Sequence, residues 1–240
     1  MQDFCTERVM QLIDELYASS QVEPPTLRYP IAPLGEIIDA SNLLCIELAD
    51  LTRTTALRYL FTQGGLLEVP VDEDQEPLAG FIHAGSRYGC IFVERRDLLV
   101  RRRFSAAHEL GHYLLHFRPA LQEAERRHHH VEISERLPLA GSETSATISV
   151  LAGDINDLAP LPPRWQMERE ANIFATLLLM PEEIVRGLAA RLPLWSSEAD
   201  FVSALATCLL VSDQAMQLRL KELQLLPLPR RVAKGFTTTS

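Results

Sequence analysis

The stretch FSAAHELGH, residues 104–112, contains the pattern HExxH. On an α-helix, residues four apart lie about 40° apart around the axis and about 6 Å along it, so the imidazoles of His108 and His112 can converge on one ion. Zinc accepts nitrogen and carboxylate ligands in such a tetrahedral site. Glu109 lies about 100° around the helix from His108. At that position it can reach a water held by the metal, where a general base is needed.

The residues around this motif predict a helix over Arg101–His116, ended by Pro119. On the helical wheel Phe104, Gly111 and Leu115 share one face, and the two histidines of the motif lie at its border. The helix is therefore expected to bury one side against a core while presenting its histidines at the edge. The small residue Gly111 would let a neighbouring helix approach closely.

A catalytic zinc site needs three protein ligands and one position open to water. His116 follows His112 by four residues, but three ligands at this spacing on a straight helix extend over about 12 Å, too far for one ion. We therefore expect His116 to cap the helix or to support a ligand. The chain lacks the longer pattern HExxHxxGxxH, which argues against a three-histidine site of the metzincin type.

A second helix, expected over Met167–Met180, offers the third ligand. Glu168 would supply a carboxylate oxygen to the metal. Asn172, one turn later on the same face, could hydrogen-bond the nitrogen of a histidine that does not bind the metal and so fix its orientation. Glu170 is the rival ligand, although it lies nearly opposite on the wheel. We favour Glu168.

Two further features of the sequence concern the same site. A donor is needed to stabilise the oxyanion in amide hydrolysis, and Tyr88, Tyr113 or a histidine of the His128–His130 run could provide it. That run could also bind metal, but consecutive residues point in different directions, so we interpret it as part of a loop.

The composition narrows the class of protein. The chain has 240 residues, 47% of them hydrophobic, and a formal net charge of −9. An acidic chain is poorly suited to non-specific binding of nucleic acid or of an anionic membrane. Its four cysteines form no CxxC pair, so we expect reduced thiols and a metal held by histidine and carboxylate. We find no export signal and no apolar run of roughly 18 residues, and expect a cytoplasmic protein without a membrane segment.

The periodicity of apolar residues and the turn signals predict an α+β fold that is mainly helical. Helices are also expected over residues 4–18, 34–40, 53–62, 182–191, 198–207 and 212–224, a strand over 43–48, and a hairpin of strands 78–83 and 88–94. Residues 118–163 are polar and rich in proline, and we interpret them as an insertion or lid with short elements such as 147–151.

These elements suggest three parts: an N-terminal helix and linker over residues 1–30, a core over 31–191, and a C-terminal helical module and tail over 192–240. The spacing of apolar and small residues in the last part is typical of a helix-turn-helix. An alternative function is therefore a DNA-binding or protein-binding regulator that uses these helices. Asp213 and Glu222 stand beside Arg219 and Lys221, however, so we expect weak affinity for phosphate and disfavour direct DNA binding.

Two motifs together resemble the paired signature of the ImmA/IrrE-type metallopeptidases: RRFSAAHELGHYLLH, residues 102–116, and EREANIFATLLLMP, residues 168–181. The stretches at residues 78–94 and 201–226 are similar to what this family carries around its catalytic helices. The resemblance covers most of residues 34–226 and is strongest at the two motifs.

The resemblance implies a gluzincin-like, zincin-type core in which a small β-sheet packs on the HExxH helix. It implies zinc-dependent cleavage of a protein inside the cell, typically a helix-turn-helix repressor that guards a mobile element or a stress regulon. His108, His112 and Glu168 match the zinc ligands, Glu109 the catalytic glutamate, and Asn172 the polar residue one turn further on. The gap between His112 and Glu168 is longer than we expect for the family, and its extra residues could cover the cleft.

Overall fold

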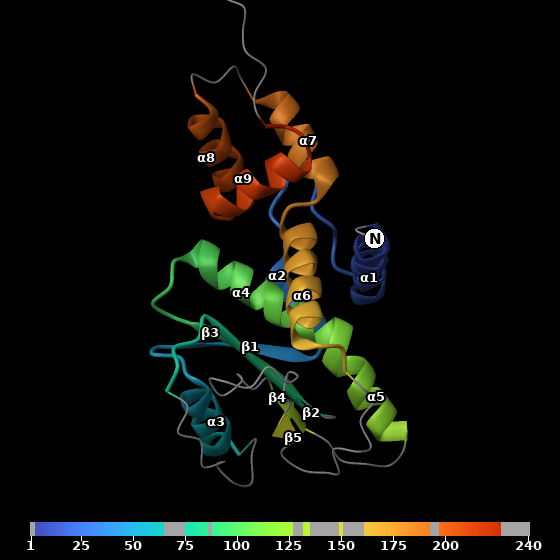
Figure 1. The fold of residues 1–240 in the computed structure, drawn as a ribbon, viewed down its shortest axis with the longest axis vertical. Coiled ribbons are helices and arrows are strands. Elements are labelled where there is room, and N and C mark those ends of the chain that lie inside the picture. The colour runs from blue at the N-terminus through green and yellow to red at the C-terminus, as the bar shows by residue number, and fades with distance from the viewer. Residues whose placement is uncertain are drawn as a thin grey trace, which may run out of the picture.

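The computed structural model describes residues 3–64, 75–85, 88–126, 132–134, 149–150, 161–192 and 197–226. It confirms the α+β class, with helices packed on a small sheet (Figure 1). The run His128–His130 and the tail from residue 227 lie outside the described residues. The predicted division of the chain at residues 30 and 191 stays a prediction.

The sheet has the strand order β1-β3-β2-β4-β5. The predicted hairpin is present, because β2 pairs antiparallel with β3, with Ile82 opposite Ile91. β1 pairs parallel with β3, while β4 pairs antiparallel with both β2 and β5. The strands are β1 (Leu43–Leu48), β2 (Gly80–Gly85), β3 (Gly89–Glu94), β4 (Glu132–Ser134) and β5 (Ser149–Val150).

Both faces of the central strands are buried. Phe81 and Phe92 face α3 (Arg53–Thr62), with which they form a small apolar cluster below the sheet (Figure 1). Ile82 and Ile91 point the other way, into the main core. Because side chains alternate along a strand, β2 and β3 can pack against helices on both sides.

The main core lies between the sheet and two long helices, α4 (Leu99–His112) and α6 (Arg164–Leu179). These helices pack closely where Gly111 faces α6. A Cβ added at Gly111 would lie 3.1 Å from Cδ1 of Phe174 and 3.2 Å from Cα of Ala171. A larger side chain at Gly111 would therefore push α6 away from α4. Two further helices, α1 (Asp3–Ser20) and α2 (Leu34–Ala40), complete this layer.

The helix that carries HExxH does not end at Pro119, so that prediction is wrong. α4 passes into a π-helical turn, η1 (Tyr113–Phe117), which continues directly as α5 (Arg118–Arg126). Pro119 comes just after this π-turn, at a point where the N–H of Arg118 still bonds to the carbonyl of Tyr113 five residues earlier. The start of the segment 118–163, which we interpreted as an insertion or lid with short elements, is therefore helical. β4 and β5 lie further along it, and β5 falls within the short element expected over residues 147–151.

Among the described residues, α6 is followed by α7 (Glu182–Arg191), α8 (Glu198–Leu209) and α9 (Asp213–Glu222). Across the described ranges, no single helix is long and apolar enough to cross a membrane. α8 and α9 together meet the length and composition requirements, but they are bent by 105°. Leu210, with a φ of 51°, makes the turn between these two helices.

Candidate metal centre

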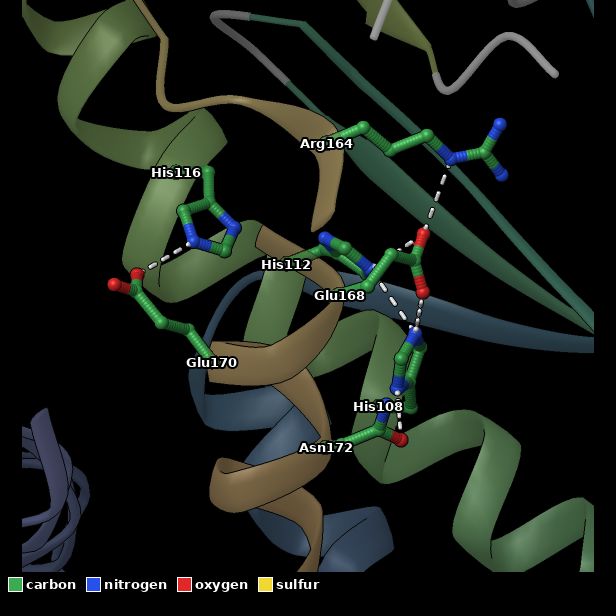
Figure 2. A network of polar contacts seen from close by, with 7 residues as sticks. All are labelled: His108, His112, His116, Arg164, Glu168, Glu170 and Asn172. Carbon is green, nitrogen blue, oxygen red and sulfur yellow. Dashed lines mark hydrogen bonds and ion pairs between the residues drawn. The ribbon is translucent and has the colours of Figure 1, made fainter. Parts of the chain in front are cut away.

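Three side chains from two helices converge beside the sheet (Figure 2). His108 and His112 project from α4, and Glu168 projects from the first turns of α6. The Nε2 atoms of the two histidines lie 3.0 Å apart. Oε2 of Glu168 lies 3.4 Å from Nε2 of His108, and its Oε1 lies 3.8 Å from Nε2 of His112. The structure thus brings these residues together, as expected for a common ligand set.

The spacing of these donor atoms fits a tetrahedral ion. Metal–ligand bonds of roughly 2.0–2.1 Å place neighbouring ligand atoms of a zinc tetrahedron about 3.4 Å apart. In the structure the two Nε2 atoms lie 3.0 Å apart, and each has a different oxygen of Glu168 nearby, at 3.4 Å from His108 and 3.8 Å from His112. Two imidazoles and one carboxylate are also the donor set of many catalytic zinc sites. The residues present therefore fit a divalent metal ion.

Asn172 and burial leave a nitrogen lone pair available for a metal on each of the two imidazoles. Oδ1 of Asn172 lies 3.2 Å from Nδ1 of His108. An amide oxygen only accepts hydrogen bonds, so this contact places the proton on Nδ1 and leaves the lone pair on Nε2. Burial, and then the neighbouring His108, lower the pKa of His112 to about 3. His112 is therefore neutral at ordinary pH and offers a lone pair too.

Glu109 is buried and lies against the start of β2. Its exposed fraction is 4%. A Cβ added at Gly80 would lie 2.6 Å from Oε1 of Glu109, so the carboxylate occupies space that only glycine leaves open. The carboxylate lies next in sequence to His108 but does not belong to the convergent group. This is the position from which a carboxylate can exchange a proton with a reactant near the metal.

A cleft of about 400 Å³ opens over these residues. Its wall includes Gly80, His108, Glu109, Glu168 and Asn172, together with two cations, Arg101 and Arg164. Within the described ranges, neither tyrosine considered for the oxyanion, at positions 88 and 113, lines this cleft.

Residues 67–137 match the family model described as the IrrE N-terminal-like domain, Peptidase_M78. The match includes the whole HExxH motif and the β2–β3 hairpin. Residues 67–137 are thus similar to the ImmA/IrrE family. Comparison with curated proteins found no match. Glu168 and Asn172 lie outside the matched residues, so their place in this site rests on the geometry above.

Arg164 is a part of this site that the sequence analysis missed. Its Nε lies 3.5 Å from Oε1 of Glu168, one turn further along α6. Figure 2 shows the two carboxylate oxygens of Glu168 turned towards Arg164 and His108. A cation at this distance favours the ionised carboxylate. Its spacing of four residues before Glu168 is the signal that could have found it.

Glu170, the rival ligand, lies away from the convergent group. Its Oε2 lies 3.0 Å from Nε2 of His116, and its Oε1 accepts a hydrogen bond from Gln166. Burial alone would raise the pKa of Glu170, but hydrogen bonds from Gln166 and His116 outweigh burial and lower it. Burial lowers the pKa of His116, and Glu170 opposes that shift. The pair is thus a neutral imidazole that donates to a carboxylate.

Proposed function

We propose that this protein is a zinc-dependent endopeptidase that hydrolyses peptide bonds in a protein substrate. His108, His112 and Glu168 hold the ion, and Glu109 acts as the general base. One observation carries the proposal: His108, His112 and Glu168, from two helices, each offer a ligand atom within 4.8 Å of the others, in a cleft that also contains the buried Glu109. The match of residues 67–137 to a peptidase family model supports the class of reaction.

Each polar side chain of the cleft has a separate role in amide hydrolysis. When bound, the ion supplies Lewis acidity, which polarises a carbonyl and makes a water more acidic. Glu109 takes the proton from the attacking water and delivers it to the departing amine. Asn172 holds the ring of His108 in place through Nδ1.

The charge on the carbonyl oxygen needs a donor, and we assign this role to Arg164. It is a cation in the wall of the cleft, held beside Glu168. A fixed guanidinium in a site with little water stabilises developing negative charge more than it would in bulk solvent. We prefer Arg164 to Tyr88 and Tyr113 because, among the described residues, neither tyrosine lines the cleft.

The substrate that we propose is a helix-turn-helix transcriptional repressor, cleaved in the cytoplasm during a stress response or in the control of a mobile element. The support for this step is the resemblance of residues 102–116 and 168–181 to the ImmA/IrrE signature.

Metal content tests the proposal directly. We expect the wild-type protein, purified without chelators, to contain about one zinc per chain, and His108→Ala and Glu168→Ala to lose it. Glu183→Ala, which removes an exposed acid on α7, is the matched control and should keep the metal. A wild-type protein that binds no zinc even after zinc is added would exclude this function.

Regulation through DNA binding by α9 is the alternative, and the position of Arg219 counts against it. Arg219 is 3% exposed, and its guanidinium donates to the carbonyl of Met180 and to Glu222. A cation held inside in this way does not reach a phosphate. Duplex DNA binding that weakens steeply with salt and persists after chelation would favour the alternative.

A further inference from the structure

A hollow continues from the cleft along the outer side of α6. The cleft and a second hollow of about 640 Å³ share Glu168 and Asn172 in their walls. The second hollow runs along α6 to Leu177, between Thr6 of α1 and Glu222 of α9. A third hollow, of about 880 Å³, shares Thr6, Leu177 and Glu222 with the second. The three hollows therefore form one path that begins at the candidate ligand Glu168.

The floor of this path is one face of α6. Trp165, Asn172, Ile173 and Thr176 line the second hollow and recur at helical spacing, so they lie along one side of the helix. Figure 1 shows α1 beside α6 and α9 near its far end, so the path lies between helices. We call this surface, from Trp165 to Leu177, the α6 groove.

The exposed side chains of the α6 groove are suited to an apolar partner. Trp165 has 67% of its surface exposed and is the largest exposed aromatic side chain among the described residues. Ile173 is half-buried beside it. Its charged side chains are one exposed cation, Arg169, and two acids that each lie beside an arginine: Glu168 beside Arg164, and Glu222 beside Arg219. The groove therefore gives little electrostatic preference and offers mainly apolar contact.

We infer that the α6 groove binds an extended, apolar segment of the protein substrate that lies to one side of the scissile bond. The inference rests on the proposed peptidase function. Continuity identifies the occupant: because Glu168 and Asn172 belong to both walls, a chain that leaves the cleft past Asn172 enters the groove. A polymer suits this path better than a small compound, since the second hollow follows α6 and the third continues beyond its end, among α1, α7 and α9.

The length of the groove sets the length of the segment. Glu168 and Leu177 are separated by about 14 Å along the helix axis, at roughly 1.5 Å per residue. An extended chain advances about 3.3 Å per residue, so about four substrate residues span this distance. The groove then distinguishes a protein substrate from a short peptide, which would occupy the cleft alone.

A peptide-length series tests this inference. A peptide found to be cleaved by the zinc-loaded protein is extended by two, four and six apolar residues, on each side in turn. We expect KM to fall about tenfold once the extension on one side reaches about four residues, the effect of burying one apolar side chain. The value of kcat should change little, because the contact is made equally in the ground and transition states. Fluorescence anisotropy with the Glu109→Gln protein measures binding without cleavage.

Two groove variants and two controls make the test specific. Trp165→Ala removes the exposed indole, and Thr176→Arg fills the groove, so both should abolish the gain from the longer peptide. Tyr29→Ala removes an aromatic side chain of equal exposure, 67%, that does not line the hollows, and Thr207→Arg alters an exposed threonine of α8. Both controls should keep the gain.

The outcomes separate the two proposals. If no peptide is cleaved and the protein binds no zinc, the peptidase function is overturned, and this inference with it. Cleavage and anisotropy that do not depend on peptide length, or a length dependence that survives in Trp165→Ala and Thr176→Arg, overturn the α6 groove alone.

Discussion

Nε2 of His116 lies 3.0 Å from Oε2 of Glu170, and both side chains are buried. His116 belongs to the π-helical turn that follows α4, and Glu170 follows Glu168 by two residues on α6. The contact therefore ties together the two helices that carry the candidate ligands. We therefore expect it to limit the rotation of α6 against α4, and so to help to place the carboxylate of Glu168.

Removal of this tie should weaken both the fold and the metal site. Glu170→Ala leaves the donors of His116 and Gln166 without their buried acceptor, so we expect the free energy of unfolding to fall by about 2–3 kcal/mol. Glu170→Gln keeps an acceptor oxygen and should cost about 1 kcal/mol or less. Urea unfolding of the metal-free proteins measures the change in stability. Competition for zinc with a chromophoric chelator measures the change in zinc affinity.

Glu125→Ala, an exposed acid on α5, is the control for this pair and should leave both quantities unchanged. If Glu170→Ala bound zinc as tightly as wild type, the contact would have no part in placing Glu168.

Glu109→Gln should separate metal binding from catalysis. The amide fills the same space beside Gly80 but cannot take a proton. We expect the variant to keep about one zinc per chain and to lose about 10²–10⁴-fold in kcat, the usual contribution of general acid–base catalysis. Elemental analysis and cleavage rates on one preparation give both numbers. Cleavage at the wild-type rate would mean that another residue is the base.

Gly80→Ala should displace the carboxylate of Glu109 without changing Glu109 itself. The added methyl group would lie 2.6 Å from Oε1 of Glu109, so the carboxylate must move. We expect a lower kcat, by about tenfold or more, with unchanged zinc content, because a small displacement of a catalytic group is costly.

Gly35→Ala is the matched control, since a Cβ there meets no heavy atom within 4 Å. It should leave kcat unchanged. Equal activity of Gly80→Ala and wild type would show that Glu109 tolerates displacement or is not the base.

Local signals in the sequence were enough for many of the elements. The helix Arg53–Thr62 has the predicted bounds because Thr52 caps it through a reciprocal hydrogen bond with Thr55. The strand Leu43–Leu48 also has its predicted bounds. The spacing of His108 and His112 carries the same kind of local information, since a straight helix brings residues four apart together.

Features that depend on distant contacts were missed. The wheel assumes a straight α-helix, whereas η1 inserts a π-turn that changes the direction of His116 and brings it to Glu170. The approach of Gly80 to Glu109 depends on how the sheet packs against α4. The periodicity of the sequence does not predict such a contact.

His83 should make the fold sensitive to acid. It is fully buried in β2, and burial, followed by the charge of Arg53, lowers its pKa from 6.5 to about 4. Between these pH values the unfolded chain binds the proton and the folded chain does not, so stability falls as the pH falls. The contribution is fully present above about pH 6.5 and is lost progressively towards pH 4. A shift of this size corresponds to about 3 kcal/mol.

His83→Leu removes this proton-binding group, so the difference in free energy of unfolding between variant and wild type should change by up to about 3 kcal/mol between pH 7 and pH 4, in favour of the variant at acid pH. Urea unfolding at several pH values, on metal-free protein, measures that difference and cancels the other titrating groups. Ile82→Val, on the same strand, should lower stability by about 0.5–1.5 kcal/mol at every pH, because it leaves a small cavity and adds no titrating group. Curves for wild type and His83→Leu that stay parallel from pH 7 to pH 4 would mean that His83 is as readily protonated in the folded chain as in the unfolded one.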